Sequence, residues 1–243
     1  MTDARLQLLD GFHLESADTH VEMPEGMQRL LAFIALNGPA HRCVIAGTLW
    51  PHVPESHALA SLRTGIWRLN RLAPRLIDAA GMGLAPSRAL WVDSRLQETF
   101  VTRVLRGPPE DDAWIMRGIG ALWQRELLPG WYDDWVVFER ERLCQLRLHA
   151  LERLAVLMTQ RHRLDLALEL ALEAVRTEPL RETAAAALMS VHIAEGNIAD
   201  ALHHYRLFRD RLNRELGVEP SPSVTSLLPR QLVRDAAVTT GGV

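Results

Sequence analysis

Three arginines lie close together between residues 49 and 72, a stretch whose one acidic residue is Glu55. A guanidinium is permanently charged and presents its donors in a planar fork, so an arginine with few carboxylate neighbours is suited to binding phosphate groups. Hydroxyl side chains in the same stretch could form hydrogen bonds with base edges. The residues concerned are Arg63, Arg68 and Arg71, accompanied by His57, Ser61 and Thr64. Their types and spacing predict a surface that binds a polyanion.

Apolar residues at helical spacing predict that a helix from about Ser56 to Leu72 holds these side chains. Ser56 is expected to cap the helix, because its hydroxyl can accept a hydrogen bond from a free backbone amide of the first turn. Pro74 is expected to end it. The residues that define its buried face are Leu59, Leu62, Ile66 and Leu69.

The polar side chains fall on the opposite side of this helix. Within roughly 40° of the outward direction, at about 100° per residue, lie His57, Ala60, Thr64, Arg68 and Arg71, with Ser61 and Trp67 at the margins and Arg63 and Asn70 on one flank. Short side chains near the first half could approach base edges, while the arginines further along reach phosphates. Recognition helices in the major groove divide their contacts in this way. The alternative is an ordinary solvated helix face.

The neighbouring segments predict a winged helix-turn-helix domain with an N-terminal sheet. Its expected elements are short strands within 5–23, helices at 27–37 and 42–50, a turn at 51–55, and a hairpin at 76–93 around Gly81-Met82-Gly83. Arg88 would lie on this hairpin wing, where it either reaches DNA or remains a plain surface residue. Trp67 is a candidate for DNA contact, although packing under the wing is the favoured interpretation.

Helical periodicity replaces the strand signals after residue 95. Residues 163–179 align with residues 197–213, a weak internal repeat of 34 residues that places Ala167 on Ala201. This period is typical of tetratricopeptide-type helical hairpins, which must stack on neighbours to bury their apolar faces. We therefore expect a mainly α fold with three parts. They are a winged helix-turn-helix domain with a small β-sheet and hairpin wing (1–95), an all-α tetratricopeptide-like domain (96–222) and a flexible tail (223–243).

Composition indicates a globular protein with a locally basic segment. The chain of 243 residues is 48% hydrophobic and 23% charged, and all 27 basic residues are arginine. Residues 41–95 carry seven arginines and three acidic residues, whereas residues 1–40 carry two arginines and six acidic residues. No apolar run is long enough to span a bilayer. Cys43 and Cys144 lack metal or redox spacing, which favours a reducing cytoplasm.

Known catalytic patterns are absent from the sequence. It contains no Gly-rich phosphate loop, no HExxH and no GxSxG motif. His192, His203 and His204 form the densest histidine group, but adjacent histidines point to different helix faces, so a zinc site is not expected. We predict no enzyme activity, no catalytic residues, no metal site and no cofactor.

Several motifs resemble those of a known family. The segments "LLAFIALN", "LWPHVPESHALASLRTGIWRLNRL" and "LWVD" are similar to the DNA-binding domain of SARP-type (Streptomyces antibiotic regulatory protein) transcriptional activators. The segments "LLPGWYDDWVVFERERLCQLRLHALERLA", "EPLRE", "EGNIADALHHY" and "LGVEPSP" resemble the bacterial transcriptional activator domain that follows it. The resemblance covers residues 5–222 and departs from the common pattern at Asn70, where members often have arginine.

The resemblance implies a function and partners. Such a protein has an OmpR-like winged helix, binds direct repeats upstream of promoters and recruits RNA polymerase holoenzyme. We expect it to be cytoplasmic and associated with the nucleoid, and to form a homodimer on double-stranded DNA. The turn residues His52, Val53 and Glu55 correspond to a polymerase contact. The alternative function is a tetratricopeptide-like adaptor that binds proteins, and DNA retention that weakens steeply with salt would distinguish the two.

Overall fold

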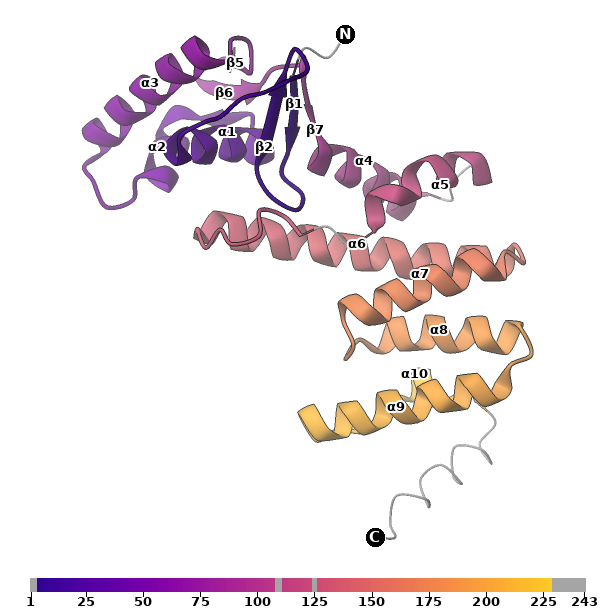
Figure 1. Ribbon diagram of the computed structural model, residues 1–243. Helices are drawn as coiled ribbons and strands as arrows, with labels where there is room; N and C mark the ends of the chain where they lie inside the picture. The colour runs from indigo at the N-terminus through magenta and orange to yellow at the C-terminus, as the bar shows by residue number, and fades with distance from the viewer. Residues whose placement is uncertain (1–3, 108–110, 124–125, 229–243) are drawn as a thin grey trace. The chain divides into compact units, whose positions relative to one another are not determined.

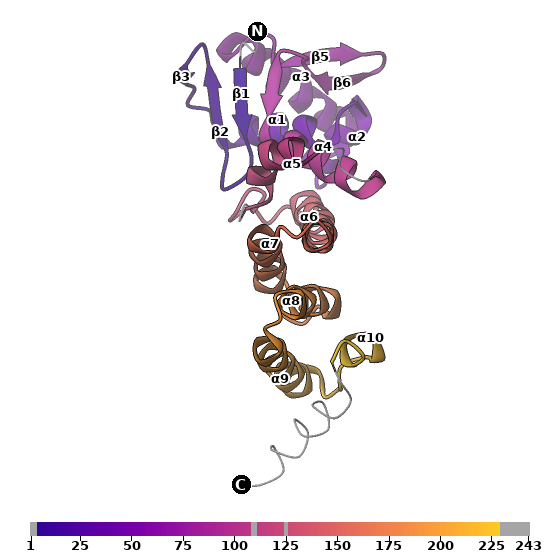
Figure 2. The same ribbon diagram turned by 90° about the vertical axis from the view of Figure 1, so that its right-hand side faces the viewer.

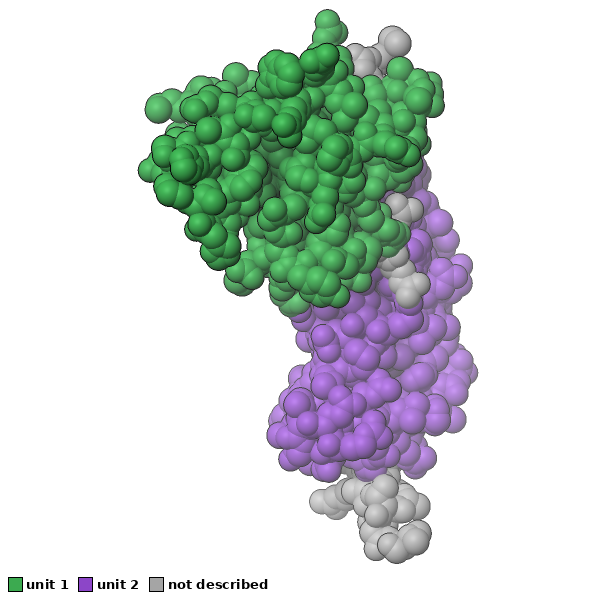
Figure 3. Space-filling model, turned by 60° about the vertical axis from the view of Figure 1, so that its left-hand side comes forward, with its two compact units in different colours: residues 1–100, 124–144 green, residues 101–123, 145–243 purple. Residues whose placement is uncertain are grey.

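The computed structural model describes residues 4–107, 111–123 and 126–228. The chain divides into two compact units (Figure 3). The first contains residues 1–100 and 124–144, and the second contains residues 101–123 and 145–243. This division differs from the boundary expected at residue 95. Leu127, Leu128, Trp135 and Leu143 join the same buried core as the N-terminal strands, so the segment that carries them belongs to the first unit.

The first unit contains a four-stranded sheet in the order β3-β2-β1-β7. Strand β1 (Ala4–Gln7) pairs antiparallel with β2 (His13–Ser16), which pairs with β3 (Thr19–His20). Strand β7 (Leu90–Val92) pairs with β1 in parallel. Residues along β1 alternate between buried and exposed, as expected for a sheet with one face on a core.

A second sheet has the order β4-β6-β5 and forms the wing. Its strands are β4 (Ala40–His41), β5 (Ile77–Ala80) and β6 (Gly83–Pro86). A Cβ on Gly83 would lie 2.3 Å from the carbonyl oxygen of Ala40, so only glycine allows β4 to pair so closely with β6. The hairpin predicted over 76–93 is therefore wrong in extent. It ends at Pro86, and residues 90–92 join the first sheet because Leu90 and Val92 are buried in its core.

Three helices pack against these sheets: α1 (Glu25–Asn37), α2 (Arg42–Leu49) and α3 (Glu55–Leu72) (Figure 1). The predicted cap at Ser56 is wrong. The residue before the first turn of α3 is Pro54, with no side-chain cap, and its carbonyl accepts hydrogen bonds from the amides of His57 and Ala58. Proline already has a backbone φ close to the helical value, so the helix begins one residue earlier than expected.

The segment between the wing and the helical hairpins is anchored by polar side chains. It contains α4 (Asp93–Arg106), α5 (Asp112–Gly118), the short 3-10 helix η1 (Ile119–Leu122) and the start of α6 (Asp134–Gln160). The Asp93 carboxylate accepts hydrogen bonds from the amides of Leu8 and Leu9 at 2.9 and 3.1 Å. The Arg140 guanidinium donates to the carbonyls of Leu127, Leu128 and Trp131, which holds the loop before α6.

The second unit follows the predicted period of 34 residues. Helices α7 (Leu164–Thr177) and α9 (Ile198–Leu216) begin 34 residues apart, as do the ends of α6 and α8 (Glu182–Ala194). Ala167 and Ala201, which the alignment pairs, are both fully buried at the fourth position of their helices. Small residues at these positions allow the helices to approach each other closely.

The first residues of the predicted tail, 223–228, are packed against the second unit. The short helix α10 (Pro222–Thr225) packs against α8, and Val224 and Leu228 are buried in a cluster with Tyr205 and Phe208. Apolar burial therefore orders the chain through Leu228. The remaining part of the predicted tail, 229–243, lies outside the described residues. The fold class is confirmed: a mainly helical chain with a small N-terminal β region followed by a helical domain.

Candidate nucleic-acid interface

Helix α3 buries the face that its periodicity predicts. Leu62 and Leu69 are almost completely buried, and Leu59 and Ile66 pack partly buried against the same core. Ala58 also lies in the core. A Cβ on Gly65 would lie 2.9 Å from Cδ2 of Leu30, so glycine lets α3 approach α1. This contact explains a residue that helix propensity alone would disfavour by about 1 kcal/mol relative to alanine.

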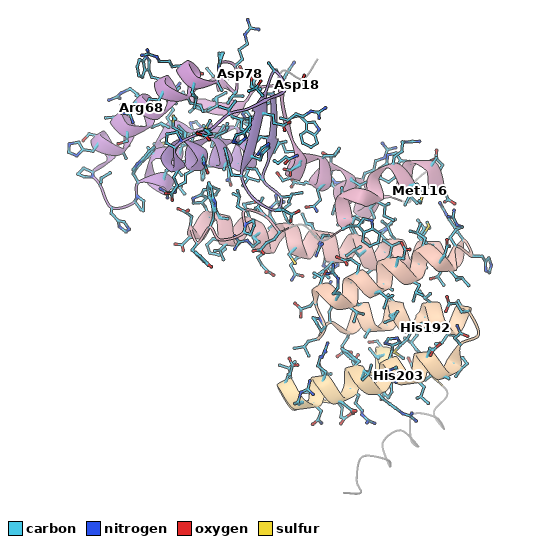
Figure 4. The ribbon with its side chains drawn as sticks, viewed as in Figure 1. Asp18, Arg68, Asp78, Met116, His192 and His203 are labelled. Carbon is cyan, nitrogen blue, oxygen red and sulfur yellow. The ribbon has the colours of Figure 1, made fainter. Side chains whose placement is uncertain are left out.

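The opposite face of α3 is exposed and polar. Arg68 projects from it in Figure 4. Ser61 is half-buried, and the hydroxyl of Thr64 donates to the carbonyl of Ala60 at 3.0 Å, which leaves its oxygen able to accept from a ligand. The exposed candidates on this face are His57, Arg63, Thr64, Trp67, Arg68 and Arg71.

The arginines of this face have no carboxylate partner in the described part of the chain. Within residues 4–107, 111–123 and 126–228, no ion pair forms to Arg63, Arg68 or Arg71. Elsewhere in the same unit, Arg29 pairs with Asp133, and the Arg142 guanidinium lies 2.7 Å from Glu98. The three arginines of α3 thus differ from Arg29 and Arg142, whose charges are balanced by carboxylates.

Trp67 does not pack under the wing, contrary to the favoured interpretation. Its side chain is 60% exposed, and the Cζ of Arg71 lies 5.5 Å from the centroid of its ring. The two residues are four positions apart, so they are neighbours on the helix surface. A cation–π contact of this kind orients the guanidinium while its donors remain accessible.

Arg88 lies away from the tip of the wing. The hairpin turns at Gly81 and Met82, whereas Arg88 is in the turn between β6 and β7, beside the base of the hairpin. Ser87 donates its backbone N–H to the carbonyl of Leu76 at 2.9 Å, so Arg88 and Arg75 are both near this base. Arg75 is exposed and was not among the predicted site residues. Its position just after Pro74, at the end of the arginine-bearing helix, could have identified it as a candidate for DNA contact.

The turn between α2 and α3 is exposed to solvent. His52, Val53 and Glu55 are all exposed, and Val53 is an exposed apolar residue flanked by Pro51 and Pro54. The prolines restrict the backbone on both sides of Val53. The turn is thus exposed, with a backbone restricted by two prolines, next to the arginine-bearing helix.

Comparisons with known proteins identify the family. The model of the bacterial transcriptional activator domain matches residues 94–230, more than half of the chain. The chain belongs to the bacterial transcriptional activator domain family. It is similar to the regulatory protein AfsR of Streptomyces griseus, with 28% identity over 87% of this chain and 22% of that protein. AfsR of Streptomyces coelicolor is 31% identical over 78% of this chain and 20% of its own length.

The similarity to solved structures concerns the fold. The Mycobacterium tuberculosis protein EmbR, solved in complex with a low affinity phosphopeptide, matches with a TM-score of 0.69 and 19% identity over 99% of this chain and 70% of that one. The chain spans about a fifth of the length of the AfsR proteins. The expected resemblance to SARP-type transcriptional activators is confirmed by the family model and by the two AfsR proteins.

The histidine group of this family member forms a stacked cluster in the second unit. The rings of His192 and His204 stack with centroids 5.1 Å apart, and His203 meets His204 edge-on. Burial lowers the pKa of His204, and the neighbouring His192 and His203 lower it further, so the neutral form is favoured. In the described ranges, no group of three or more potential ligands could hold a metal ion. Nor does any described helix combine the length and apolarity needed to cross a bilayer.

Proposed function

We propose that this protein binds duplex DNA through α3 and activates transcription by recruiting RNA polymerase to promoters with direct repeats. The observation that carries the proposal is the exposed face of α3, with three arginines that no described carboxylate neutralises. Phosphates would release counterions on binding these side chains, and the short polar residues near Thr64 would face the bases. The retention of the chain on duplex DNA, measured across a salt titration, tests this proposal.

A second candidate function is a protein adaptor. An apolar groove in the second unit, lined by Leu188 and Leu207 among others, favours it. An adaptor that no longer binds DNA would show no retention on duplex DNA at low salt. Retention that falls steeply with salt supports the activator instead.

Direct repeats should be bound by two protomers. A single α3 helix covers a short site, so one protomer is expected to bind weakly, while two protomers on adjacent repeats gain from linkage. We expect a two-repeat duplex, with repeats about one helical turn apart, to bind two copies at lower protein concentration than a one-repeat duplex binds one. Sedimentation with labelled duplexes measures both stoichiometries. Equal affinity and single occupancy on the two duplexes would contradict this expectation.

Substitutions in the exposed turn should separate binding from activation. Replacing His52, Val53 and Glu55 together by Ala removes an exposed projection without touching the α3 arginines, so operator binding should be unchanged. Transcription from the target promoter in a purified system should fall several-fold, because a polymerase contact is lost. If transcription stays at the wild-type level while the protein occupies its site, the polymerase contact lies elsewhere.

A further inference from the structure

The first turns of α6 are apolar on two opposite sides. Trp135, Val136 and Leu143 are buried in the core of the first unit. Val137 and Phe138 nevertheless face solvent, and Phe138 is 74% exposed. Exposed aromatic residues of this size that adjoin further apolar surface mark interaction sites more often than isolated surface residues do.

Acidic residues border this exposed apolar pair along the helix. Asp134 and Glu141 are exposed and, with Val137 and Phe138, occupy positions i, i+3, i+4 and i+7 on one helix face. We call this set, Asp134, Val137, Phe138 and Glu141, the α6 ridge. The ridge therefore presents an apolar pair between two carboxylates, a surface suited to an apolar groove with basic edges.

A groove of complementary character lies in the second unit. It has a volume of about 500 Å³ and is formed by α7, α8 and α9. Its lining includes Val175, Leu188, Leu207, Phe208, Arg211 and Arg214, which we call the α9 groove. Leu207 is 54% exposed, so the apolar wall is open to a partner.

The charge of the α9 groove is positive. Glu215 approaches both Arg211 and Arg214, but at 4.0 and 3.6 Å, and one carboxylate cannot balance two guanidinium groups. Asp210, the acidic residue of the lining, pairs with Arg209 at 2.7 Å. Acidic side chains at the edges of an apolar segment would therefore complement this groove.

We propose that the α6 ridge of one protomer docks into the α9 groove of a second copy of this chain. Apolar residues would fill the groove, while the ridge carboxylates meet Arg211 and Arg214. The contact joins two different surfaces and is therefore heterologous, or head-to-tail. This choice of partner rests on the proposed function, because direct repeats place the DNA-binding units of two protomers in the same orientation, and a head-to-tail contact suits that arrangement.

Complementary variants of the full chain test the contact. Phe138→Asp disables the ridge, and the double variant Arg211→Glu/Arg214→Glu disables the groove; all three side chains are exposed, so folding should be preserved. In sedimentation velocity we expect the wild type to associate as its concentration rises and each variant to remain monomeric. An equal mixture of the two variants should form dimers and nothing larger, because each pair retains one intact ridge and one intact groove.

Matched substitutions outside both surfaces serve as controls. Val156→Asp alters an exposed residue further along α6, and Arg206→Glu alters an exposed arginine of α9 outside the groove lining. Both should associate like the wild type. The proposal is overturned if the disabled variants also associate like the wild type, if the wild type remains monomeric at every concentration, or if the mixture fails to form dimers.

Measurements of DNA binding test the proposed contact and the proposed function separately. On a one-repeat duplex all variants should match the wild type, because none alters α3. On a two-repeat duplex the disabled variants should lose on the order of 100-fold in affinity, the gain that linkage provides. If no protein binds either duplex, the proposed function fails, while the sedimentation result still decides the contact.

Discussion

Replacing Arg68 by Ala is expected to weaken binding to every duplex sequence and to reduce the salt slope by about one unit. Arg71→Ala should have the same effect, because each guanidinium is exposed and free of a described carboxylate. The triple variant that also removes Arg63 should lose roughly 100-fold in affinity near physiological salt, since about one counterion is released for each neutralised phosphate. A salt titration of duplex binding measures both quantities. Substitutions at His57, Ser61 or Thr64 should instead change which sequence is preferred.

Arg117→Ala is the control for this series, because it removes an exposed arginine from the short helix α5. Its binding curve should superimpose on that of the wild type. If Arg68→Ala also binds like the wild type at every salt concentration, α3 is not the helix that contacts DNA.

Asp93→Ala should be among the most destabilising single changes in the first unit. Asp93 is 6% exposed, and its carboxylate accepts hydrogen bonds from the amides of Leu8, Leu9 and Ser94. Alanine would leave buried donors without an acceptor, at about 1–3 kcal/mol for each group. We expect the free energy of unfolding to fall by about 3–5 kcal/mol, measured by urea denaturation of the full chain.

Two further variants sharpen this measurement. Asp93→Asn retains one acceptor oxygen, so its loss should be intermediate. Asp165→Ala removes an exposed carboxylate from α7 and should change stability by less than about 0.5 kcal/mol. An Asp93→Ala protein that unfolds at the wild-type urea concentration would show that these hydrogen bonds contribute little.

Local periodicity was sufficient to predict the orientation of α3 and the repeat of the second unit. The buried positions of Leu62 and Leu69 follow from helix geometry alone, and the aligned Ala167 and Ala201 occupy equivalent sites. Non-local pairing was not predictable in the same way. The parallel pairing of β7 with β1 and the anchoring of Leu8 by Asp93 join residues about 85 positions apart, which no local pattern encodes.

The candidate site was also predictable only in its local features. The exposure of its polar face followed from the spacing of residues, whereas the surroundings of single side chains did not. Trp67 was expected to be covered because tryptophan is usually well buried, but no described element packs over it. Arg88 was assigned to the wing because the hairpin was predicted to extend over 76–93, and the early end of β6 places it beside the base instead.

Because Trp67 is exposed, the intrinsic tryptophan fluorescence of the protein depends on what covers α3. All seven tryptophans lie in the described part of the chain, and Trp67 alone among them is exposed. A soluble quencher such as acrylamide would therefore reach this indole before the others and remove the red edge of the emission. Any molecule that covers α3 should shield the indole or quench it directly. The intrinsic fluorescence of the unlabelled chain thus distinguishes occupation of this face from binding anywhere else on the protein.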